Sequence, residues 1–129
     1  MRPLFLTLAA ISAFLGVGMG AFGAHALKSV LSAEMLDVYK TAVSYQMWHA
    51  LGLLAIASLH SQNPRSKLLI WAGWLMFTGI ILFSGSLYAL TLLNLKWLGV
   101  ITPFGGTAFL SAWLLVTLFS LTKPALPTL

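Results

Sequence analysis

Four long apolar blocks, separated by short polar stretches, dominate the pattern of hydrophobic and polar positions along this chain. They cover residues 3–24, 41–59, 68–92 and 98–121. A helix of about 20 apolar residues crosses a bilayer core of roughly 30 Å, so each block is long enough to span a membrane. The pattern therefore predicts an all-α membrane protein, built as a bundle of four transmembrane helices.

The connection between the first two blocks is the longest and carries both acidic residues of the chain. Ser32 precedes Ala33 and Glu34, and a serine followed by an acidic first turn is typical of a helix N-terminus. Apolar and polar side chains then mix as far as Lys40. We expect either a short amphipathic helix here or a helical lead-in that is continuous with the second span.

Composition supports the membrane class and narrows the expected partners. Hydrophobic residues make up 60% of the 129 residues and charged residues 7%, against about 25% charged residues in average soluble domains. This length allows one domain, which we expect to cover residues 1–129. The net charge is +5, but the basic residues stand singly or in pairs between apolar blocks. Membrane lipids are therefore expected partners, and nucleic acid is not.

Block length and charge also predict the topology. The first apolar run, residues 4–24, is longer than the roughly 7–15 residues of a cleavable signal sequence, so we expect an uncleaved first span. An even number of spans places both termini on one side of the membrane. Four basic residues fall on that side: Arg2, Arg65, Lys67 and Lys123. Three fall on the other: Lys28, Lys40 and Lys96. This majority favours both termini in the cytoplasm.

The second block carries a polar stripe, Tyr45, Gln46 and His49, within two helical turns. Strongly polar groups are costly in lipid and normally face protein or a water-filled cavity. His49 lies about 13 Å along the helix from Lys40, at about 1.5 Å per residue, which places it near mid-membrane. We expect the stripe to face the other helices.

Antiparallel packing brings further polar residues into the half of the membrane away from the termini. The candidate polar intramembrane site is His25, Tyr45, Gln46, His49, Ser84, Tyr88 and Thr102. Two interpretations stay open. These groups either hydrogen-bond between helices, at about 0.6 kcal/mol each, or line a cavity that binds a small solute, a lipid headgroup or a proton.

Metal and catalytic chemistry find little support in the sequence. His25 and His49 lie at different depths, and no cysteine or intramembrane carboxylate completes a ligand shell. A pair of Ser84 or Ser86 with His49 would lack both a GxSxG turn and an orienting acid. We therefore predict a non-enzymatic protein with no catalytic residue, no metal site and no cofactor.

Small residues mark places where helices approach closely. One ridge in the first block is small at every fourth position: Ser12, Gly16, Gly20 and Ala24. Such a ridge packs against another helix, either one of this chain, which we favour, or one of a second copy in a homo-oligomer. After Pro103, Gly105 and Gly106 predict close backbone approach or an irregular first turn in the fourth helix.

Three stretches occur together in a recognisable order. They are 20–28 (GAFGAHALK), 41–51 (TAVSYQMWHAL), and 83–88 (FSGSLY) with 101–106 (ITPFGG). In this order the chain resembles the transmembrane protein 256 family, whose bacterial branch is called domain of unknown function 423 or uncharacterised protein family 0382. The resemblance implies a small multi-helix protein of the bacterial inner (plasma) membrane. It places the candidate site residues and Pro103 at signature positions, and it implies no activity, substrate or cofactor.

The expected function is that of a small integral membrane protein with a polar, His-containing site between helices, in an accessory, structural or lipid-interacting role. The alternative is a small oligomeric transporter or channel for a proton or small solute. An open, water-filled path to His49 would favour transport. A dry, fully hydrogen-bonded cluster would favour the structural role.

Overall fold

The computed structural model describes residues 3–122, and the regular elements in that range are all helical. The α-helices are α1 (Leu4–His25), α2 (Ala33–Gln62), α3 (Lys67–Gly79), α4 (Ser86–Leu92) and α5 (Thr102–Thr122). A π-helical segment, Ile80–Gly85, joins α3 to α4, and a 3₁₀ segment, Lys96–Val100, precedes α5. The predicted all-α fold is confirmed.

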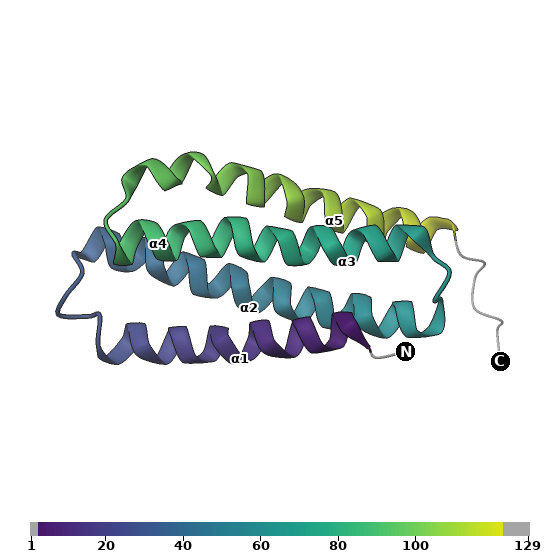
Figure 1. The fold of residues 1–129 in the computed structure, drawn as a ribbon, viewed down its shortest axis with the longest axis horizontal. Helices are drawn as coiled ribbons and strands as arrows, with labels where there is room; N and C mark the ends of the chain where they lie inside the picture. The colour runs from purple at the N-terminus through teal and green to yellow at the C-terminus, as the bar shows by residue number, and fades with distance from the viewer. Residues whose placement is uncertain (1–2, 123–129) are drawn as a thin grey trace.

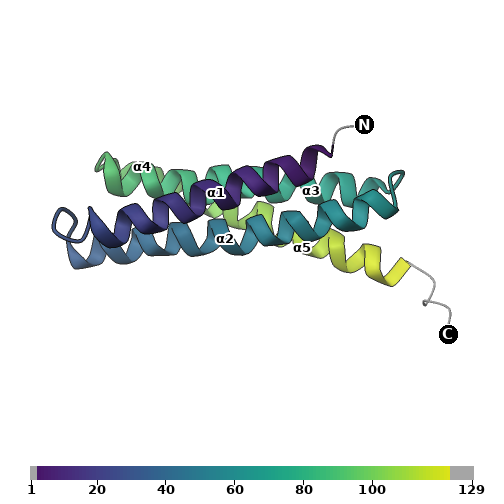
Figure 2. The same cartoon turned by 90° about the horizontal axis from the view of Figure 1, so that it is seen from below.

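Four rods, each long and apolar enough to cross a membrane, run side by side (Figures 1 and 2). Because the π-helical segment continues α3 into α4, Lys67–Leu92 forms a single rod. The other rods are α1, α2, and α5 with the 3₁₀ segment before it. The predicted bundle of four transmembrane helices is confirmed.

The two ends of the bundle are closed by different segments (Figure 1). The loop end holds the α1–α2 connection, residues 26–32, and the connection from α4 to α5, residues 93–101. The terminal end holds the first turn of α1, the α2–α3 turn at residues 63–66, and the last turn of α5. Short connections make neighbouring helices antiparallel, so the polar residues of several helices return to the loop end.

Helix α2 runs unbroken from Ala33 to Gln62, so the segment before the second span is a lead-in and not a separate helix. The backbone N–H of Met35 donates a hydrogen bond to Ser32 Oγ at 3.2 Å, which confirms Ser32 as the N-cap. The 30 residues of this helix give a length of about 45 Å, against a bilayer core of roughly 30 Å. Helix α2 therefore extends beyond the hydrocarbon.

One seam of α2 faces the rest of the bundle. Its buried positions alternate at spacings of three and four residues: Tyr39, Ala42, Gln46, His49, Leu53 and Ile56. This is the spacing of a coiled-coil seam, whose positions are ordinarily apolar. Polar residues stand on it at Gln46 and His49. Helices in lipid gain little free energy from burying apolar surface. Buried polar side chains such as Gln46 and His49 can therefore determine which helix faces contact each other.

The small-residue ridge of α1 packs against α2. A methyl group added at Gly16 would overlap the sulfur of Met47 in α2, and one added at Gly20 would crowd the same helix. Ser12 is buried in α1, whereas Ala24 is exposed. The ridge therefore meets a helix of the same chain from Ser12 to Gly20, and it ends before Ala24.

Helix α5 begins directly against the π-helical segment. A methyl group added at Gly105 would overlap the backbone nitrogen of Phe83, whereas one added at Gly106 would meet Phe83 Cδ2 at an ordinary 3.9 Å. A glycine is needed at the first position because the two backbones touch there. The close approach expected for this glycine pair is therefore made by Gly105.

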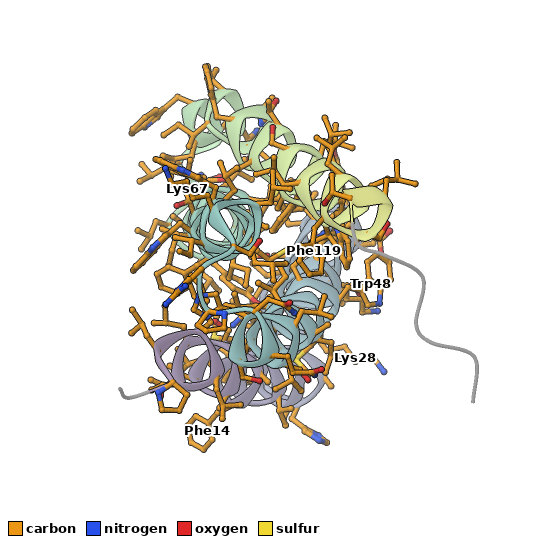
Figure 3. All side chains as sticks on the ribbon, turned by 90° about the vertical axis from the view of Figure 1, so that its right-hand side faces the viewer. Phe14, Lys28, Trp48, Lys67 and Phe119 are labelled. Atoms are coloured by element: carbon orange, nitrogen blue, oxygen red, sulfur yellow. The ribbon has the colours of Figure 1, made fainter. Side chains whose placement is uncertain are left out.

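The outside of the bundle is strongly apolar. Phe14, Trp48 and Leu110 are 78%, 59% and 74% exposed. Seen from the terminal end, Phe14 and Trp48 point away from the helices (Figure 3). Soluble monomers rarely expose contiguous apolar patches larger than a few hundred Å², so this surface matches hydrocarbon rather than water.

Candidate functional site

A polar cluster joins the helices in the loop-end half of the bundle, and Gln46 of α2 lies at its centre. Its side-chain Nε2 donates a hydrogen bond to the backbone oxygen of Ser12 in α1 at 2.8 Å. Its Oε1 accepts a hydrogen bond from the Tyr88 hydroxyl of α4 at 2.6 Å. One buried amide therefore connects three helices and uses both of its ends.

Tyr39 makes a second connection between α2 and α1. Its hydroxyl donates a hydrogen bond to the backbone oxygen of Met19, and its ring centroid lies 5.4 Å from that of Tyr88. A methyl group added at Gly23 of α1 would overlap the Tyr39 ring. The glycine thus makes room for a large side chain that is only 1% exposed.

Two serines of the third rod complete the cluster. The hydroxyl of Ser84 donates to the backbone oxygen of Ala42 in α2 at 2.7 Å, and it lies in the π-helical segment. The hydroxyls of Ser86 and Thr102 are 2.7 Å apart, which links α4 to the start of α5. We use the name polar cluster for these hydrogen-bonded side chains: Tyr39, Gln46, Ser84, Ser86, Tyr88 and Thr102.

His49 lies next to the polar cluster in a different environment. Its Nδ1 is 2.7 Å from the backbone oxygen of Tyr45. Since a carbonyl oxygen only accepts hydrogen bonds, Nδ1 carries the proton, and in the neutral ring Nε2 is an unprotonated acceptor. The imidazole stacks on Phe109 of α5, with centroids 3.5 Å apart and planes inclined by 14°.

Tyr45 belongs to this aromatic environment. Its ring stacks on Phe83 of the π-helical segment at 4.4 Å and on His49 at 5.7 Å. With Phe109 these rings form an aromatic column between α2, the π-helical segment and α5. Offset and edge contacts between aromatic rings contribute about 0.5–1.5 kcal/mol beyond area burial, so the column holds α5 against α2.

The candidate residues predicted from the sequence thus separate into three groups. Gln46, Ser84, Tyr88 and Thr102 lie in the polar cluster, and Tyr45 and His49 lie in the aromatic column. His25 lies outside both groups, because it is the last residue of α1 and its side chain is exposed.

The candidate set left out four residues of this region: Tyr39 and Ser86 of the polar cluster, and Phe83 and Phe109 of the aromatic column. Tyr39 falls among the mixed apolar and polar residues of the lead-in, and Phe109 was not singled out. Tyr39 lies seven residues before Gln46, two helical turns away on the same seam, so extending the seam backwards would have found it. Phe109 carried no comparable signal, because its role depends on how α5 is rotated about its own axis.

This geometry is suited to holding helices together. Each side chain of the polar cluster has a hydrogen-bond partner in the chain. The partner found for His49 among residues 3–122 is a carbonyl oxygen and not a nucleophilic hydroxyl. In the same range, no three His, Cys, Asp or Glu side chains are grouped as a metal site requires.

Comparison with known proteins gives matches over most of the chain. Residues 19–106 match the family described as protein of unknown function (DUF423). The UPF0382 membrane protein YwdK of Bacillus subtilis is 48% identical over 112 residues, which cover 87% of this chain and 91% of the relative. A UPF0382 membrane protein of Staphylococcus saprophyticus is 47% identical over 114 residues, 88% of this chain and 93% of the relative. No solved structure matches the chain.

Proposed function

Because this chain belongs to the DUF423 family, whose relatives are named as membrane proteins without an activity, we propose its function from the geometry of the polar cluster. The family membership predicted from the sequence motifs is confirmed. In our proposal the protein is a non-enzymatic membrane protein with a structural or accessory role. The polar cluster holds its helices in one arrangement, and the apolar outer surface meets lipid or another membrane protein.

The observation that carries this proposal is the buried amide of Gln46. Both of its ends are hydrogen-bonded, one to α1 and one to α4, so each end is already engaged by a neighbouring helix. A site that binds and releases a ligand needs polar groups that are free when the ligand is absent. The arrangement around Gln46 instead favours a permanent connection between helices.

One observation favours the second candidate function, proton transfer by an oligomer. His49 is an ionisable group within a span, and its Nε2 is an unprotonated acceptor in the neutral ring. Intramembrane histidines occur in proton relays. The stacking of the imidazole on Phe109 supports the structural role instead, because a relay needs a chain of hydrogen-bonding groups on both sides.

Proton flux into liposomes separates the two functions. The protein is reconstituted into phosphatidylcholine–phosphatidylglycerol liposomes that enclose a pH-sensitive dye, and a pH gradient is imposed. We expect the flux to equal that of protein-free liposomes. A flux that His49→Leu abolishes and Trp113→Leu retains would replace the structural role by proton transfer.

The structural role also predicts a difference in stability between these two variants. His49 is 7% exposed and Trp113 is 42% exposed. His49→Leu should therefore lower the thermal unfolding temperature in detergent more than Trp113→Leu does. Equal tolerance of both substitutions would count against a structural role for the seam of α2.

We further propose that the protein lies in the bacterial plasma membrane with both termini in the cytoplasm. The bacterial relatives, named as membrane proteins, support the membrane. The basic residues Arg65 and Lys67 of the α2–α3 turn region, which lies at the terminal end, support the orientation. A C-terminal green fluorescent protein fusion should fluoresce, and a C-terminal alkaline phosphatase fusion should be inactive. The opposite pair of results would reverse the orientation.

A further inference from the structure

A crevice opens between α1, α2 and α3 at the terminal end, the half of the molecule that the polar cluster does not reach. Its volume is about 600 Å³, within the roughly 300–1,000 Å³ typical of small-molecule sites. Its walls are mostly apolar and come from the three helices and the α2–α3 turn. Its lining includes Leu6, Ala57, His60, Ile70 and Trp74.

Aromatic contacts form the inner wall of the crevice. The ring of Phe5 makes edge contacts with Trp74 at 5.6 Å and with His60 at 5.7 Å. The Nε2 atom of His60 is buried and has no hydrogen-bond partner among residues 3–122. An unsatisfied buried nitrogen costs about 1–3 kcal/mol, so the wall contains one polar atom that the chain leaves unsatisfied.

Two cationic residues, Arg65 and Lys67, follow the crevice residue Pro64 in the chain. Arg65 lines a second hollow that shares Pro64 with the crevice. Lys67 begins α3, and Ile70 and Trp74 follow it at spacings of three and seven residues, which places all three on one face of that helix. Figure 3 shows Lys67 beside α3 at this end of the bundle.

No acidic side chain neutralises these cations. The two acidic residues of the sequence, Glu34 and Asp37, lie in the first turns of α2 at the loop end. The terminal end therefore combines an apolar crevice with an uncompensated positive rim at the boundary between hydrocarbon and water. Basic pockets between transmembrane helices bind the headgroups of anionic lipids.

We propose that the terminal-end crevice is a binding site for an anionic phospholipid. An acyl chain lies along Leu6, Ile70 and Trp74, and the phosphate meets the side chains of Arg65 and Lys67. This inference goes beyond the proposed structural role and does not depend on it. A lipid held in this way would couple the first turn of α1 to α3 at the end where few polar contacts join the helices.

Native mass spectrometry of the protein in detergent micelles tests the site. The protein is titrated with dioleoyl phosphatidylglycerol and, separately, with dioleoyl phosphatidylcholine, which has the same acyl chains and no net charge. We expect the first phosphatidylglycerol to bind about tenfold more tightly. Arg65→Gln combined with Lys67→Gln should reduce this preference to about twofold or less.

Two further variants separate the crevice from general electrostatic attraction. Lys28→Gln combined with Lys96→Gln removes two cations from the loop end and should leave the preference unchanged. Leu6→Trp fills the crevice from a position that is 43% exposed and should weaken the binding of both lipids. These side chains are exposed, so the variants are expected to fold, and thermal unfolding measures that directly.

Three results would overturn the proposal. Equal affinity of the wild-type protein for the two lipids would mean annular lipid only. If the two double variants, at Arg65 and Lys67 and at Lys28 and Lys96, lost the preference for phosphatidylglycerol equally, net charge alone would explain the attraction. Unchanged phosphatidylglycerol binding by Leu6→Trp would mean that the headgroup binds at the surface without the crevice.

Discussion

The two halves of this bundle are held together by different interactions. In the loop-end half, buried polar side chains reach from one helix to the backbone or side chain of the next, as Gln46 and Ser84 do. In the terminal half of residues 3–122, the core is made mostly of packed apolar side chains. The seam of α2 continues there with Leu53 and Ile56, which pack with Phe5 and Met76 in the apolar core.

The difference between the halves shows which interactions fix the positions of helices in lipid. Lipid tails are as apolar as leucine, so burying apolar surface between helices contributes little, and close packing and hydrogen bonds decide the arrangement. The loop-end half has both. In the terminal half of residues 3–122 the helices meet mainly through packing contacts, and this half contains the 600 Å³ crevice.

The largest effect should follow from breaking the loop-end half at Gly105. In Gly105→Ala the new methyl group overlaps the backbone of Phe83, and a backbone yields less than a side chain. We expect a loss of about 3 kcal/mol in the free energy of unfolding, measured by dodecyl-sulfate titration in mixed micelles. Gly106→Ala has room for its methyl group and should change stability by less than about 0.5 kcal/mol. Similar values for the two variants would contradict the close approach.

The second effect tests the central amide. Gln46→Leu keeps the volume of the side chain, loses two interhelical hydrogen bonds and leaves the Tyr88 hydroxyl without its partner. We expect a loss of about 2 kcal/mol in the same unfolding titration. Gln62→Leu on the same helix is the control, because Gln62 is exposed and bonds weakly, at 3.4 Å, to its own helix. If Gln46→Leu lost no more unfolding free energy than the control, the polar cluster would not be what holds this half together.

The third effect comes from a glycine-to-alanine substitution in the terminal half, for comparison with Gly105→Ala. In Gly73→Ala the new methyl group overlaps the ring of Phe5, a side chain in the first turn of α1 that can move. We therefore expect about 1–2 kcal/mol, less than at Gly105. Adding Phe5→Leu should recover part of the loss. A cost equal to that of Gly105→Ala would mean that the two halves are equally rigid.

The smallest effect concerns a single hydroxyl. Ser84→Ala removes the hydrogen bond to the Ala42 carbonyl, which is already part of the α2 backbone ladder. The average interhelical hydrogen bond in a membrane is worth about 0.6 kcal/mol, and we expect a loss of that size in the unfolding titration. Ser120→Ala, an exposed serine bonded within its own helix, should show no measurable change. A loss above that of Gln46→Leu would shift the centre of the cluster to the π-helical segment.

The spans themselves could be predicted closely from the sequence. The first was expected at residues 3–24 and is Leu4–His25, and Ser32 was recognised as the cap of a helix. These features are local, because apolar length and capping chemistry depend on neighbouring residues in the chain. The lead-in could not be distinguished from a separate helix, since both have the same local pattern.

The candidate site could be predicted only in part. The depth of Gln46 and Tyr88 followed from helix rise, and both lie in the polar cluster. His25 was assigned to the same half of the membrane, but it is exposed at the end of α1. Depth is one coordinate of a side chain in a bundle, and the second, its direction around the helix axis, depends on contacts with other helices.

By itself, the sequence determined the solvent of this protein, the number of its spans and the half of the membrane in which its polar groups lie. Hydropathy and block length decide these properties one segment at a time. The tertiary structure alone decided that Gln46 bonds to α1 and α4, that His49 stacks on Phe109, and that a crevice opens at the terminal end. These depend on how each helix is rotated against its neighbours, which is set by the fit of side chains from distant parts of the chain.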